Sequence, residues 1–117
     1  MAIRALIVDD HAPFRWTARQ LLEGEGFAVV GEASDGAEAV AAAAALHPDL
    51  VLLDVYLPDA DGFEIAEHLT SAAAAPIVVL TSSRDGSDYG PLVSRCGARG
   101  FVPKAELSAE ALKALLD

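Results

Sequence analysis

The sequence predicts a doubly wound α/β fold in a single domain, built on a five-stranded parallel sheet. Five short runs of aliphatic residues alternate with longer segments that have helical spacing. The first, third and fourth runs are apolar at nearly every position, which is typical of strands covered by helices on both faces. The chain has 117 residues, enough for one hydrophobic core but not for two independent domains. We therefore expect one domain over residues 1–117.

The five predicted strands are short and evenly distributed along the chain. They cover residues 5–8, 28–30, 50–53, 77–80 and 101–102. Parallel strands need crossover connections, and crossovers through helices are right-handed in nearly all known sheets. The expected strand order is 2-1-3-4-5, the flavodoxin-like winding.

The first helix is expected at residues 12–25. Pro13 suits the start of a helix, and apolar residues recur at i, i+4, i+7 and i+8 from Phe14. Trp16 lies off this apolar face, so we expect its side chain to be exposed.

The second and third helices each begin with a capping box, in which two acidic residues three positions apart satisfy free amide groups. The boxes are Asp35 with Glu38, before the apolar run at 39–46, and Asp61 with Glu64, before the run at 65–69. Pro48 is expected to end the second helix.

The fourth and fifth helices differ in how strongly the sequence specifies them. The segment 84–100 contains several glycines and Pro91, so we expect a helix of only about two turns after that proline. The last helix, at residues 109–116, has Ser108 in position to cap it.

Charge and composition exclude several classes of function. Eight Lys plus Arg residues against 18 Asp plus Glu residues give a formal net charge of −10. Such a chain repels nucleic-acid phosphates and anionic lipids, so we expect no direct binding of nucleic acid. The longest apolar run, at 39–46, is far shorter than the ~20 residues of a membrane span. The single Cys96 cannot form an internal disulfide, and no signal-peptide core develops before Asp9, so a cytoplasmic location is expected.

Polar residues stand where four of the predicted strands end. The first strand is followed by Asp9 and Asp10, the third by Asp54, the fourth by Thr81 and the fifth by Lys104. In doubly wound sheets, ligands bind outside the carboxyl ends of the strands, near the point where the winding reverses. We therefore expect these five side chains to share one site.

Three carboxylates on one edge of a sheet require a cation. Two unit charges ~4 Å apart repel by on the order of 4 kcal/mol at an effective dielectric of 20. Mg²⁺ takes oxygen ligands, needs only one or two carboxylates and completes its shell with water and phosphate oxygens. With Mg²⁺ and an ammonium nearby, a carboxylate can attack a phosphoryl group. Asp9 and Asp10 alone would more often be helix-capping residues, and only the combination favours a metal site.

The motifs around these residues resemble the receiver domain of two-component response regulators, and the resemblance covers essentially the whole chain. They are LIVDDH at 6–11, LLD at 52–54 followed by Pro58, DG at 61–62, VLTS at 79–82, and GA at 97–98 leading to GFVPK at 100–104. The stretch 104–107 resembles receivers attached to LuxR-type DNA-binding domains, which suggests that the output is transcription regulation.

The resemblance implies that Asp54 is the phosphoacceptor. Asp9 and Asp10 would hold Mg²⁺, Asp10 more directly, with Asp54 and the main-chain carbonyl of Tyr56 as further ligands. A histidine kinase or a phosphotransfer protein would be the partner that donates the phosphoryl group. The domain would then be a signalling phosphoacceptor that catalyses its own modification, not an enzyme with turnover.

The resemblance also implies which residues read the phosphorylated state. Thr81 and Lys104 would contact the phosphoryl group, and Phe101 would change rotamer as the Thr81 hydroxyl moves. From the sequence alone, Ser82 or Ser83 could take the place of Thr81. A homodimer is compatible with the resemblance, but the sequence does not locate its surface.

Three alternatives compete with this interpretation. A haloacid-dehalogenase-like phosphatase also forms an aspartyl phosphate, but its motif places two acids two positions apart, whereas Asp9 and Asp10 are adjacent. A flavin-binding protein of this fold would need a phosphate-binding loop where the acidic pair stands. A receiver-like module that acts through protein contacts without phosphorylation stays open, with Tyr56 and the short fourth helix in its favour and the full acid set against it.

Overall fold

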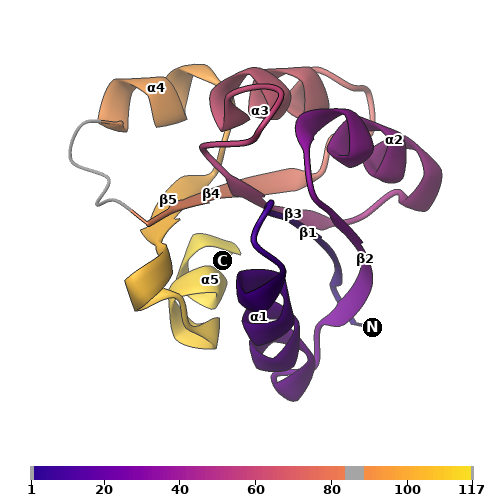
Figure 1. Cartoon of the computed structure of the whole chain (residues 1–117), viewed down its shortest axis with the longest axis vertical. Coiled ribbons are helices and arrows are strands. Elements are labelled where there is room, and N and C mark those ends of the chain that lie inside the picture. The colour runs from indigo at the N-terminus through magenta and orange to yellow at the C-terminus, as the bar shows by residue number, and fades with distance from the viewer. Residues whose placement is uncertain (1, 84–88, 117) are drawn as a thin grey trace.

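The computed structural model describes residues 2–83 and 89–116 and shows the predicted architecture (Figure 1). Five parallel strands lie in the order β2-β1-β3-β4-β5. Helices α1 and α5 cover one face of the sheet, and α2, α3 and α4 cover the other. The elements are β1 (Arg4–Val8), α1 (Ala12–Gly24), β2 (Ala28–Ala33), α2 (Gly36–Leu46), β3 (Leu50–Asp54), α3 (Gly62–Thr70), β4 (Ile77–Ser82), α4 (Gly90–Arg95), β5 (Gly100–Pro103), the 3-10 turn η1 (Lys104–Glu106) and α5 (Ala109–Leu116). The predicted fold class and winding order are confirmed.

The three central strands are buried on both faces, as their apolar sequences predicted. Every residue of β3 is buried, and β1 and β4 are buried except at their first residues. Successive side chains point to opposite faces of a sheet. Ile7 and Leu52 therefore join the core under α1 and α5, whereas Leu6 and Leu53 join the core under α2, α3 and α4. This doubly covered sheet holds the strand ends in place.

The predicted helix caps are confirmed. Three side-chain oxygens accept main-chain amide hydrogens: Asp35 from Glu38 at 2.8 Å, Asp61 from Glu64 at 2.8 Å, and Ser108 from Ala111 at 3.0 Å. Helices α2 and α3 begin directly after their caps, three residues earlier than the apolar runs indicated. The fourth helix is short, as predicted, and residues 84–88 of its segment lie outside the described part of the chain. Within the described ranges, no helix is long and apolar enough to cross a bilayer.

Asp59, in the loop between β3 and α3, caps α2 from outside that helix. Its two carboxylate oxygens accept hydrogen bonds from the amides of Gly36 and Ala37 at 2.7 and 3.0 Å. These hydrogen bonds hold the pKa of Asp59 below its ordinary value. The loop that follows Asp54 is thereby tied to a neighbouring helix.

Gly62 begins α3 at the point where this helix meets the end of β3. Its amide donates to the carbonyl of Val55 at 2.5 Å. A Cβ at position 62 would lie 2.7 Å from Cα of Val55 and would also overlap the main-chain carbonyl oxygen of Asp54. Glycine therefore allows α3 to approach the strand that ends in Asp54.

We expect Gly62→Ala to lower the free energy of unfolding by about 2 kcal/mol or more, because the added methyl group meets main-chain atoms that cannot move aside. Gly24→Ala is the matched control, since nothing lies within 4 Å of a Cβ built at that position. Alanine favours helix, so this control should be as stable as wild type or slightly more stable. Urea denaturation followed by circular dichroism measures both variants, and equal stabilities would contradict the close approach.

Candidate functional site

The carboxyl ends of four strands bring the predicted site residues together at one edge of the sheet. Asp54 is the last residue of β3 and stands opposite Thr81 of β4 in the parallel register. Asp9 and Asp10 directly follow β1, and Lys104 directly follows β5. Apart from the adjacent pair Asp9 and Asp10, these residues are far apart in the sequence, and the winding of the sheet makes them neighbours.

Three carboxylates form a cluster that fits a hard divalent cation. One oxygen from each of Asp9, Asp10 and Asp54 lies within 4.8 Å of the others. Asp9 and Asp54 are buried, with 0% and 5% of their surface exposed. Asp10 is exposed and leaves one side of the cluster open to solvent. An all-oxygen set with an open side suits Mg²⁺, which keeps several waters when it binds.

Lys104 supplies positive charge to this cluster. Its Nζ atom lies 2.6 Å from Oδ2 of Asp9 and 3.3 Å from Oδ2 of Asp54, over the ring of Phe14. Burial alone would lower the pKa of the ammonium, but the two carboxylates outweigh burial and raise it. The ammonium of Lys104 thus lies between two carboxylates, which shows that the cluster accommodates positive charge.

Asp54 is a carboxylate whose surroundings disfavour its charge. Burial raises its pKa, and the nearby charge of Asp9 raises it further. Hydrogen bonds from the Tyr56 amide at 3.2 Å and from Lys104 at 3.3 Å act in the opposite direction. The net result is a pKa of about 6. A poorly solvated carboxylate of this kind is a candidate nucleophile once a cation neutralises its surroundings.

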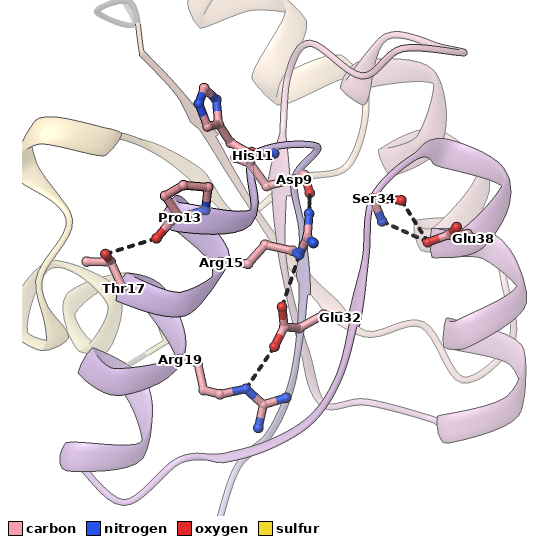
Figure 2. A network of polar contacts seen from close by, with 9 residues as sticks. All are labelled: Asp9, His11, Pro13, Arg15, Thr17, Arg19, Glu32, Ser34 and Glu38. Carbon is pink, nitrogen blue, oxygen red and sulfur yellow. Dashed lines mark hydrogen bonds and ion pairs between the residues drawn. The ribbon is translucent and has the colours of Figure 1, made fainter.

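Asp9 is held through its main chain as well as its side chain. Its amide donates to the carbonyl of Ala33 at 3.0 Å, and its Oδ1 accepts from the amide of His11 at 2.8 Å. Its carbonyl oxygen accepts from Nη1 of Arg15, whose Nε pairs with Glu32 at 3.0 Å (Figure 2). The turn from β1 into α1 is therefore fixed on several sides.

Thr81 has a buried hydroxyl that finds no hydrogen-bond partner within residues 2–83 and 89–116. The residue is 1% exposed, and leaving a buried hydroxyl unsatisfied typically costs about 1–3 kcal/mol. Ser82 is also buried but is engaged in other contacts, and Ser83 is exposed. The sequence offered three candidates for the hydroxyl that contacts a ligand. Of these, Thr81 fits that role best.

Four aromatic rings lie together next to the loop that follows Asp54. The ring of Tyr89 lies 5.4 Å from that of Phe101 and 5.6 Å from that of Phe63, and its hydroxyl is 2.8 Å from the hydroxyl of Tyr56. Phe101 is half-buried, and its switch role stays a prediction, as does the carbonyl of Tyr56 as a metal ligand. Sequence reasoning missed Tyr89, which lies among glycines without periodic spacing; its aromatic character was the one signal that could have pointed to it.

Known proteins are similar to this chain in sequence. The family model of the response regulator receiver domain matches residues 5–117. The transcriptional regulatory protein PdtaR of Mycobacterium tuberculosis is 39% identical over 114 residues, which cover 90% of this chain and 56% of that protein. The transcriptional regulatory protein LiaR of Bacillus subtilis is 36% identical over 115 residues, covering 97% of this chain and 54% of that protein. The chain spans about half the length of these curated relatives.

Solved structures are similar over nearly the whole chain. A LuxR-family two-component response regulator from Aurantimonas sp. SI85-9A1 has a TM-score of 0.88 at 33% identity, covering 99% of this chain and 86% of that chain. The signal receiver domain of NarL from Mycobacterium tuberculosis has a TM-score of 0.87 at 36% identity, covering 99% and 94%. The predicted resemblance to receivers of LuxR-type regulators is thus confirmed. This chain belongs to the response regulator receiver domain family.

Proposed function

We propose that residues 1–117 form the phosphoacceptor unit of a two-component response regulator, with Asp54 as the acceptor. The observation that supports this most is the acid cluster itself. Asp54 is buried within a set of three carboxylates, 3.3 Å from the Lys104 ammonium and opposite Thr81, whose hydroxyl has no hydrogen-bond partner in the described part of the chain. A histidine kinase or a phosphotransfer protein would donate the phosphoryl group.

The proposed transfer forms one bond and breaks one bond at phosphorus. A carboxylate oxygen of Asp54 attacks the phosphorus of a phosphohistidine, and the P–N bond breaks. The electron pair of that bond passes to the imidazole nitrogen, which is then free to take a proton from solvent. The Lys104 ammonium stabilises the negative charge on the phosphoryl oxygens, and the Thr81 hydroxyl donates a hydrogen bond to one of them. The domain thereby catalyses its own modification.

Asp9, Asp10, Asp54 and the main-chain carbonyl of Tyr56 would hold Mg²⁺. When bound, the ion supplies positive charge that neutralises the carboxylates and the phosphoryl oxygens. Asp10 would contribute most directly, because it is exposed and Asp9 is already engaged with Lys104.

Phosphorylation of Asp54 would change the conformation of the domain. Movement of the Thr81 hydroxyl toward the phosphoryl group would leave space for the ring of Phe101, and α4 would repack in consequence. The relatives named above are transcriptional regulatory proteins, which supports transcription regulation in the cytoplasm as the output. A homodimer is compatible with this role. The net charge of −10 supports output through another domain or a partner, without direct nucleic-acid binding by these residues.

Phosphorylation is tested by intact mass spectrometry after incubation with Mg²⁺ and acetyl phosphate. We expect the wild-type chain to gain the mass of one phosphoryl group. No such gain is expected when EDTA is present during the incubation. Asp54→Asn keeps the shape of the side chain but removes the nucleophile, so this variant should gain no phosphoryl mass. Asp61→Asn is the matched control, because asparagine still caps α3. An adduct on Asp54→Asn, or none on wild type, would defeat the proposal.

The role of Thr81 is tested by a nearly isosteric substitution. Thr81→Val removes a hydroxyl that has no partner among residues 2–83 and 89–116, so the unphosphorylated chain should be as stable as wild type or about 1 kcal/mol more stable. The rate of phosphorylation by acetyl phosphate should fall roughly tenfold or more, whereas Thr81→Ser should keep most of the rate. Thermal melting and time-resolved mass spectrometry give the two quantities. A destabilised Thr81→Val that is phosphorylated at the wild-type rate would refute this role.

A further inference from the structure

Arg15 connects three elements of the fold at the edge of the acid cluster. It lies in α1, donates through Nη1 to the main-chain carbonyl of Asp9 after β1, and pairs through Nε with Glu32 of β2 at 3.0 Å (Figure 2). Its side chain is 18% exposed, so these contacts are partly withdrawn from water. Neither Arg15 nor Glu32 has a part in the chemistry proposed above.

The carbonyl of Asp9 needs this donor. Asp9 is 0% exposed, and a buried main-chain carbonyl is unfavourable without a hydrogen-bond partner. Strand β1 ends at Val8, and α1 begins at Ala12 after His11, whose side chain makes no capping hydrogen bond. The turn that carries Asp10 is therefore held mainly by the contacts of Asp9, one of which is the guanidinium of Arg15.

Glu32 keeps the guanidinium of Arg15 in a fixed orientation. Its carboxylate accepts from Nε of Arg15 at 3.0 Å and from Nε of Arg19 at 2.8 Å (Figure 2). Burial alone would raise the pKa of Glu32, but the hydrogen bonds from Arg19 and Arg15 outweigh burial and lower it. The carboxylate is therefore charged at neutral pH. A planar guanidinium anchored on one edge directs its other N–H groups along defined lines.

We infer that Arg15 is a positioning residue for the divalent cation: by holding the Asp9 carbonyl, it sets the orientation of the acidic turn and so the affinity for Mg²⁺. The inference rests on the proposed function, since it takes the acid cluster as the Mg²⁺ site. The atom of Asp9 that accepts from Arg15 is the main-chain carbonyl oxygen. Groups that orient metal ligands in this way typically change metal affinity by about 10–100-fold when they are removed.

Arg15→Met and Arg19→Met form the matched pair for the test, because each removes one guanidinium from Glu32 but only Arg15 contacts Asp9. Isothermal titration of the full chain with MgCl₂ gives the dissociation constant, at a temperature where circular dichroism shows each variant folded. We expect about tenfold weaker binding for Arg15→Met and wild-type binding for Arg19→Met. Arg15→Lys keeps a cationic donor and should recover part of the loss.

The outcomes separate this inference from the proposed function. If Arg15→Met melts at a lower temperature but binds Mg²⁺ as tightly as wild type, Arg15 only stabilises the fold and the inference is wrong. Equal losses in Arg15→Met and Arg19→Met would also overturn it, since they would trace to Glu32 alone. If the wild-type chain binds no Mg²⁺, the proposed function itself fails. Should Arg15→Met not fold, Arg15→Lys takes its place: weaker Mg²⁺ binding than in Arg19→Met supports the inference, and binding equal to that of Arg19→Met overturns it.

Discussion

The ion pair of Lys104 with the buried carboxylates of Asp9 and Asp54 is the interaction on which the site depends. Two carboxylates side by side in a buried place are unfavourable unless a cation is close. The winding of the sheet places the end of β5 at the same edge as the ends of β1 and β3. The Lys104 ammonium therefore lies next to the two carboxylates. Because helices cover both faces of the sheet, the strand ends cannot separate to relieve the repulsion. The charge cluster is therefore part of the fold.

The same burial makes the stability of the metal-free chain depend on pH. Folding raises the pKa of Asp54 from 3.8 to about 6, so the folded chain binds a proton more tightly than the unfolded chain does. The stability contributed by this group is fully present below pH 3.8 and is lost as the pH rises through about 6. A cation that binds the cluster opposes this loss, because it stabilises the ionised carboxylates. Ligand binding and the electrostatics of the fold are thus linked at one residue.

Features that follow from local patterns or from strand order could be predicted from the sequence. Apolar runs predicted the sheet, and strand order then made Asp54 and Thr81 neighbours, because it determines which strand ends meet. Helices α2 and α3 start directly after the caps that the capping boxes predicted, three residues before their apolar runs, since an apolar run marks the first buried turn rather than the cap. Side-chain contacts outside these patterns had no such signal. The cap that Asp59 provides for α2, the hydrogen bond of Arg15 to the Asp9 carbonyl and the contacts of the Tyr89 ring follow only from the three-dimensional structure.

Titration of the Asp54 carboxyl carbon by ¹³C NMR, with and without Mg²⁺, tests most directly whether the buried cluster needs a cation. Asp54→Asn identifies the resonance by its loss. We expect an apparent pKa of about 6 in the metal-free chain and a clearly lower value at saturating Mg²⁺, because the ion favours the ionised form. A pKa at the ordinary value of 3.8, unchanged by Mg²⁺, would contradict the claim that burial beside Asp9 makes Asp54 dependent on positive charge.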